Sequence, residues 1–176
     1  MLDLVYEGIL KFNEEKTKIL EVASSVTFIE TKKNKIVVDT SAKSKTEDLK
    51  IYFKNKKINM DEINYVINTH DHFDHVSNNN LFKNAKIINQ SNFKELNDPE
   101  IEIMETPGHT FDSISVIYGD YLISGDASPL KNNVLKERAP GVFVDFELAL
   151  NSIRKIKSLN KNIVTGHDGI LYKNEY

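Results

Sequence analysis

The chain has 176 residues, 40% of them hydrophobic and 28% charged, with a formal net charge of −3. This length predicts one domain over residues 1–176 with a full hydrophobic core, and the slight acidity argues against a basic nucleic-acid-binding surface. Because there is no cysteine, disulfides are excluded and any bound metal must use nitrogen and oxygen ligands.

The first stretch, MLDLVYEGILKFNEE, reaches acidic residues at once and holds no long apolar run. We therefore expect no signal peptide, no membrane contact and a cytoplasmic location.

Strands are expected where short β-branched or apolar runs lie between polar turns. These segments are residues 3–10, 24–31, 35–40, 63–69, 85–89, 100–106, 113–126 and 161–169. A polar turn at 32–35 predicts a hairpin, and Gly119–Asp120 predicts a tight turn that divides segment 113–126 into two strands.

Helical spacing of apolar residues marks two further segments. Residues 40–58 read as a surface helix, and 144–159 as the clearest amphipathic helix in the chain. Residues 78–84 are expected to form one or two helical turns. The helix at 144–159 has its apolar positions at Phe146, Leu148, Ala149, Ile153, Ile156 and Leu159.

Three of the five histidines of the chain lie in NTHDHFDHVSNN, residues 68–79. An isolated histidine is usually structural, but here the spacing favours metal binding. In an extended segment, His70 and His72 can reach one ion, while Asp74 and His75 follow within a turn and can reach a second. Imidazole with carboxylate is a ligand set typical of zinc or iron.

The two remaining histidines and one aspartate also follow strand-like runs, and each comes after a small residue that lets the backbone bend. The segment TPGHT carries His109, SGD carries Asp126, and GHD carries His167. Ends of neighbouring strands meet at one rim of a sheet, so we expect these side chains to gather there.

The motif HDHFDH, followed in order by TPGHT, SGD and GHD, resembles the metallo-β-lactamase superfamily over nearly the whole chain. The resemblance implies an α+β fold, a four-layer αββα sandwich. It assigns His70, His72 and His109 to one metal, Asp74, His75 and His167 to a second, and Asp126 as a bridge between them. Asp39, which follows a strand, matches an aspartate that supports the ligand histidines.

The resemblance implies two divalent ions as cofactors, with zinc first and iron or manganese as alternatives. Two such ions can share a water and lower its pKa, so that a bridging hydroxide acts as the nucleophile. Asp74 is the candidate catalytic residue, in the role of orienting that hydroxide. No serine or cysteine nucleophile is required.

The same features narrow the reaction. A carboxylate at Asp126 argues against true β-lactamases. His72 stands where flavodiiron proteins carry glutamate, and the short segment after His167 argues against a glyoxalase II-type helical domain. The prediction is a hydrolase of a small ester, thioester, lactone or phosphodiester. An RNA or DNA phosphodiesterase, and a metal-binding or sensing module without turnover, remain alternatives.

Partners and specificity are less constrained. We expect a small-molecule substrate in preference to nucleic acid, and leave open a homodimer through the N-terminal strand. Residues 128–146 are the expected source of specificity. Candidates to hold an anionic substrate group are Lys131, Lys136 and Arg138, although solvated surface charge is the commoner role. Asp71 is expected to face solvent, and Asp112 and Asp168 are weaker candidates for supporting ligands.

Overall fold

The computed structural model describes residues 1–176 and contains two five-stranded sheets. The first has the order β1-β2-β3-β4-β5 and the second β10-β9-β8-β7-β6. The strands of the first sheet are β1 (Leu2–Phe12), β2 (Ile19–Glu30), β3 (Lys35–Val38), β4 (Tyr65–Ile67) and β5 (Lys86–Ile88). Those of the second are β6 (Ile101–Glu105), β7 (Ile114–Tyr118), β8 (Tyr121–Gly125), β9 (Asn162–Thr165) and β10 (Ile170–Leu171).

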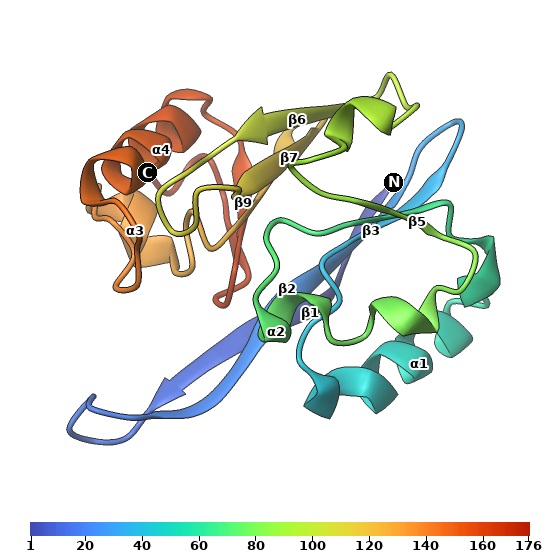
Figure 1. Cartoon of the computed structure of the whole chain (residues 1–176), viewed down its shortest axis with the longest axis horizontal. Coiled ribbons are helices and arrows are strands. Elements are labelled where there is room, and N and C mark those ends of the chain that lie inside the picture. The colour runs from blue at the N-terminus through green and yellow to red at the C-terminus, as the bar shows by residue number, and fades with distance from the viewer.

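Four α-helices and several short 3-10 turns complete the fold. The helices are α1 (Thr46–Asn55), α2 (Phe73–Val76), α3 (Lys131–Leu135) and α4 (Phe146–Ser158). In Figure 1, α1 lies beside the first sheet and α3 and α4 lie beside the second. None of the helices combines the length and the apolar character needed to cross a lipid bilayer.

Every segment predicted as strand contains one, and both predicted helices are present. The expected turn in 78–84 is a 3-10 turn at Asn79–Leu81. The sequence did not predict α2, α3 or β10, because elements of four, five and two residues are too short to show a period.

The four layers follow from the alternation of side chains along each strand. In β3, Ile36 and Val38 join a core between the two sheets, while Val37 joins a second core under α1. In β9, Val164 faces the core between the sheets, and Ile163 faces a third core under α3 and α4. The strands are therefore apolar on both faces, as an αββα sandwich requires.

Helices α1 and α4 each bury one apolar face against a sheet. Leu49 and Phe53 of α1 are buried one turn apart, as are Ala149 and Ile153 of α4. Helix α4 begins at its N-cap Asp145, whose Oδ1 accepts the Leu148 amide at 2.9 Å.

The apolar face expected for α4 is only partly buried. Phe146, Leu148 and Leu159 remain exposed. They lie at the ends of the helix, and Phe146 packs on Phe143 instead, with ring centroids 5.7 Å apart.

Strand direction decides where functional side chains can gather. β3 pairs in parallel with β4, and β8 pairs in parallel with β9. β6 runs antiparallel to β7, as β8 does, so β6 and β8 point the same way. The segments that follow β3, β4, β6, β8 and β9 carry all the candidate ligands. In addition, the Ser25 amide of β2 donates to the Gly166 carbonyl at 2.6 Å, which joins the two sheets near this edge.

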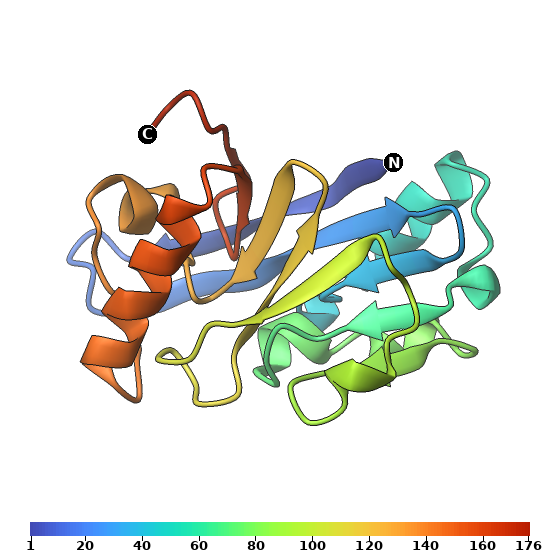
Figure 2. The ribbon, with the colours of Figure 1, turned by 90° about the horizontal axis from the view of Figure 1, so that it is seen from above.

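The β1–β2 hairpin extends well beyond the sandwich, as the blue ribbon shows at the lower left of Figure 1 and the left of Figure 2. Its outer part leaves Phe12, Ile19 and Leu20 exposed. β1 is the edge strand of the first sheet.

Asp98 ties together the end of the sandwich away from the candidate ligands. Its carboxylate accepts the Thr31 hydroxyl at 2.6 Å and the Asn34 amide at 2.7 Å, and also the Glu100 backbone N–H. Burial raises the pKa of this carboxyl, but these donors outweigh burial and lower the pKa below its ordinary value.

Replacing Asp98 with alanine should lower the free energy of unfolding at pH 7 by about 1–3 kcal/mol, because three donors lose their acceptor. A lowered folded-state pKa gives stability that is present above the unfolded pKa and is lost as the pH falls through the folded value. Urea unfolding at pH 7 and below pH 4 should therefore show the difference from wild type shrinking in acid. Asp48→Ala, an exposed change in α1, is the control; a difference independent of pH would contradict this account.

Candidate metal centre

The structure brings all seven predicted ligand residues into one cluster. They form three overlapping groups, and within each group the candidate ligand atoms lie within 4.8 Å of one another. The groups are His70, His72 and His109; His70, His75 and Asp126; and Asp74, His75 and His167.

We call the first of these the triple-histidine group. The Nδ1 of His72 lies 3.0 Å from the Nε2 of His70 and 3.0 Å from the Nε2 of His109. His70 and His109 are buried, whereas His72 is exposed, so this group is the side of the cluster open to solvent.

The third group, which we call the Asp74 group, is buried throughout. The Oδ2 of Asp74 lies 3.6 Å from the Nε2 of His167 and 3.9 Å from the Nε2 of His75. Asp74 and His75 reach it from α2, and His167 from the turn after β9.

The Asp126 carboxylate lies between the two groups. Its Oδ2 is 3.5 Å from the Nε2 of His109, and its Oδ1 is 3.1 Å from the Nε2 of His167 and 3.4 Å from that of His75. The Oδ2 also lies 3.4 Å from the Nε2 of His167. Oδ1 therefore faces the Asp74 group and Oδ2 lies between the two groups, which is a placement a bridging ligand could have.

Three of the histidines are oriented through the other ring nitrogen. The Nδ1–H of His75 donates to Asp39 at 2.7 Å, that of His109 to the Val142 carbonyl at 2.8 Å, and that of His167 to the Ala23 carbonyl at 2.9 Å. Each bond turns an Nε2 into the cluster, as supporting contacts do at metal sites. Asp39 was expected from the sequence, but the two carbonyls were not, since backbone oxygens leave no residue signal.

Asp39 is itself held by Thr69. The Thr69 amide donates to Oδ1 and the Thr69 hydroxyl to Oδ2, both at 2.8 Å. Two donors from Thr69 therefore fix the carboxylate that receives the His75 Nδ1–H.

Two buried atoms of the cluster lack any hydrogen-bond partner: the Nε2 of His75 and the Oδ1 of Asp126. Buried polar groups are almost always paired, and two unpaired ones facing each other call for a missing partner. A divalent cation accepts imidazole nitrogen and carboxylate oxygen together. The residues present therefore fit a bound metal.

Neighbouring charges shift the pKa values of the cluster in different directions. Burial lowers the pKa of His70, and neighbouring His75 lowers it further, which leaves His70 neutral. Burial opposes charge on His75, but Asp39 and Asp126 outweigh it and raise the pKa of His75 well above its ordinary value. Burial raises the pKa of Asp126, but His75 and His167 more than offset it and hold that pKa well below its ordinary value. The carboxylates of Asp39 and Asp126 thus favour positive charge at His75, whereas His70 stays a neutral imidazole.

Glycines allow the close approach that the sequence suggested. Gly108 has φ +132°, and a Cβ there would overlap the backbone of Ala149 in α4. A Cβ on Gly166 would overlap the carboxylate of Asp126.

Other predicted residues do not join the cluster. Asp71 faces solvent as expected, and Asp112 is also exposed. Asp168 is exposed and accepts the Lys131 amide at 3.2 Å, so it supports α3 rather than a ligand histidine. The side chains of Lys131, Lys136 and Arg138 make no polar contact with the cluster.

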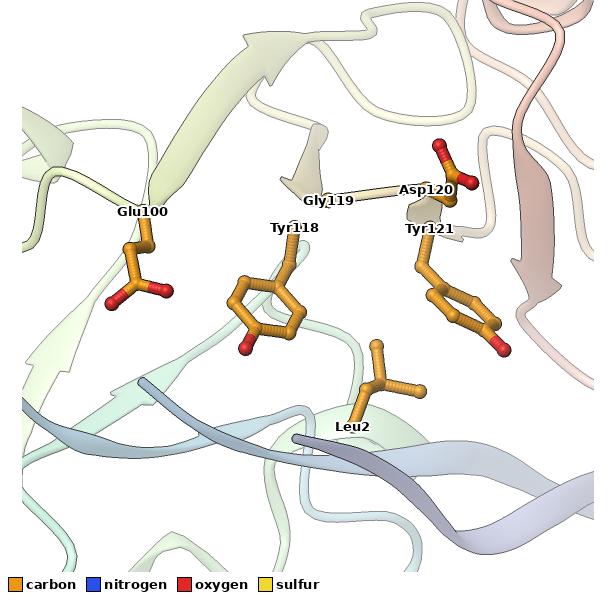
Figure 3. Close-up of a pocket in the computed structure, with 6 residues that line it drawn as sticks. All are labelled: Leu2, Glu100, Tyr118, Gly119, Asp120 and Tyr121. Atoms are coloured by element: carbon orange, nitrogen blue, oxygen red, sulfur yellow. The ribbon is translucent and has the colours of Figure 1, made fainter. Parts of the chain in front are cut away.

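A surface pocket of about 490 Å³ lies at the opposite end of β7 and β8 from the cluster. Figure 3 shows Tyr118, Tyr121 and Leu2 along its walls, with Glu100 and Asp120 at its sides. None of these residues is a candidate ligand.

The comparisons with known proteins agree with the fold. The sequence profile of the metallo-beta-lactamase superfamily matches residues 19–96. A "probable metallo-hydrolase" of Methanocaldococcus jannaschii is 48% identical over 183 residues, covering 98% of this chain and 89% of its own. The chain belongs to the metallo-β-lactamase superfamily. The class of enzyme is accordingly metal-dependent hydrolase.

More distant relatives include lactonases. The N-acyl homoserine lactonase AiiA of Bacillus thuringiensis is 30% identical over 143 residues, which are 61% of this chain and 57% of that protein. A solved N-acyl homoserine lactone hydrolase with N-hexanoyl-L-homoserine at its catalytic metal center superposes with a TM-score of 0.76. It is 22% identical, and the match covers 95% of this chain and 92% of that one. At this identity the likeness supports the fold alone.

Replacing Asp39 with alanine should weaken metal binding by about 10- to 100-fold, the usual effect of removing a supporting contact. The His75 Nδ1–H loses its acceptor, so the ring is free to turn. Competition with a chromogenic chelator would measure the affinity. Asp71→Ala is the matched control, an exposed aspartate beside the same cluster, and equal affinities in both variants would contradict this role.

Proposed function

We propose that the chain is a dinuclear hydrolase that cleaves a small carboxylic ester, thioester or lactone, or a phosphodiester. His70, His72 and His109 would hold one divalent ion, Asp74, His75 and His167 the other, and Asp126 both. The observation that carries this is the placement of the Asp126 carboxylate, whose oxygens lie 3.1–3.5 Å from imidazole nitrogens of both groups. Zinc is the first candidate, with iron and manganese as alternatives.

When bound, such a pair supplies a hydroxide nucleophile at neutral pH and stabilises the oxyanion formed from the substrate. The chain contributes orientation. Asp74, held on α2, has its Oδ2 toward His75 and His167, and its carboxylate can accept a hydrogen bond from the attacking water. The neutral imidazole of His70 offers a lone pair, and Asp39 keeps His75 in one orientation. His72, the exposed ligand, marks the face where substrate enters.

Exposed apolar residues close in the chain to two of the ligands favour an ester or lactone with an apolar group. Phe73 is the residue after His72 and is 66% exposed, and Phe111 is two residues after His109 and is 69% exposed. Val142 is exposed too, and its carbonyl accepts the His109 Nδ1–H. The lactonase relatives support a lactone within this class.

The test is a substrate panel with metal-supplemented protein: nitrophenyl esters, a thioester, an N-acyl homoserine lactone, bis(p-nitrophenyl) phosphate and single-stranded RNA. We expect metal-dependent turnover of an ester or lactone that His109→Ala abolishes. Cleavage of RNA alone would instead support the phosphodiesterase reading. Tight metal binding with no turnover of any substrate would support a sensing module and refute the proposal.

A further inference from the structure

The loop after β3 is strained at two of three consecutive residues. Asp39 has φ +55° and Ser41 has φ +61°, in the left-handed region that residues other than glycine rarely adopt. Such backbone persists only where its surroundings hold it, and it gathers at functional sites. This loop begins with the carboxylate that receives the His75 Nδ1–H.

Asn78 holds the loop. Its side chain is completely buried, and its Nδ2 donates to the carbonyls of Thr40 at 2.8 Å and Ala42 at 2.9 Å. The Ser41 carbonyl lies 3.3 Å from the same nitrogen. One amide group thus serves three consecutive carbonyls of the strained loop.

The same residue joins the loop to the helices. The Oδ1 of Asn78 accepts the hydroxyl of Thr46, the first residue of α1. Its backbone N–H donates to the Thr40 hydroxyl at 3.2 Å, and the Thr40 amide donates to the His75 carbonyl at 2.6 Å. Loop, α1 and α2 therefore meet at Asn78, three residues beyond His75.

We propose that Asn78 is a positioning residue of the Asp74 group, and this rests on the function proposed above. It clamps residues 39–42 against α2 and so keeps the Asp39 carboxylate aimed at His75. Without its amide donors, the carbonyls of Thr40 and Ser41 lose this partner, Ala42 keeps only the Lys45 amide, and the left-handed residues can relax. His75 bonds to Asp39 directly, whereas His70 reaches it only through the Thr69 hydroxyl, 3.2 Å from its Nδ1. His72 and His109 make no hydrogen bond to this loop, so the larger effect falls on the ion that His75 would hold.

The experiment is a cobalt(II) titration of metal-free protein, followed by visible absorption and resolved into two affinities. Asn78→Asp keeps the shape and removes the amide donors, and Asn78→Ser shortens the side chain. Asn80→Asp is the matched control, since Asn80 is exposed two residues away. We expect both Asn78 variants to bind one cobalt ion about 10- to 100-fold more weakly and to retain the other, while the control is unchanged.

The outcomes separate the two proposals. Failure of the wild type to bind cobalt would refute the metal site itself, and the clamp with it. Two normal affinities in the Asn78 variants, or an equal loss at both ions together with a lower Tm, would refute the clamp alone. If neither variant folds, hydrogen exchange in the metal-free wild type decides: the amides of Thr40 and Thr69 should be protected like those of β3. Exchange as fast as in an exposed loop would overturn the proposal.

Discussion

Replacing Asp126 with alanine is expected to lower kcat/KM by at least about 10³-fold. This carboxylate is the one group that faces both ligand groups, so its loss weakens both ions and removes the bridge between them. The measurement is kcat/KM on the best ester or lactone substrate, with the ions per chain determined on the same sample.

The control for this prediction is Asp120→Ala. Asp120 lies in the β7–β8 turn and pairs at the surface with Lys173 at 3.2 Å, so its loss should leave both quantities near wild type. An Asp126→Ala enzyme that kept two ions and most of its activity would contradict the bridging role.

Removal of the metal is expected to lower the thermal stability of the wild type substantially. Ligand at about 1,000 times its Kd stabilises a protein by about 4 kcal/mol, which for a chain of this size corresponds to a fall in Tm of about 8–16 °C on chelation. The buried carboxylates of Asp74 and Asp126 then keep only imidazole partners, which adds to the loss. Thermal unfolding with and without a chelator measures the difference.

Two variants, one at a candidate ligand and one far from the cluster, give the matched comparison for this prediction. In Asp126→Ala, the chelator should change Tm much less than in wild type, because less metal is bound at the start. Asp98→Ala, which lies at the other end of the sandwich, should unfold earlier but keep the full response to the chelator. An equal response in wild type and Asp126→Ala would contradict the account.

Most strands could be predicted because they are apolar on both faces, whereas the αββα arrangement followed only from the resemblance of the motifs to a known family. Ile36, Val37 and Val38, for example, give a short apolar run that is typical of a buried strand. Three candidate ligands could be predicted from their position in the sequence. His109, Asp126 and His167 each follow a small residue close to the end of a predicted strand. The parallel pairing of β3 with β4 and of β8 with β9, which brings those ends together, is a property of the sheet and not of any one segment.

Other features could not be predicted, because they depend on contacts between distant segments. The carbonyls of Ala23 and Val142 orient His167 and His109, yet they belong to residues without a polar side chain. Asn78 lies three residues after His75 in the sequence, but nothing in the sequence marks it as functional. Its role depends on the left-handed turn at Asp39 and Ser41, which sequence pattern does not reveal.

The central claim is that side chains from distant segments hold two cations in one cluster. Anomalous diffraction from crystals of zinc-loaded protein tests it most directly. The account predicts two peaks, one contacted by His70, His72 and His109, the other by Asp74, His75 and His167, with Asp126 reaching both. A map without peaks in this cluster, or with zinc only at other surfaces, would contradict it.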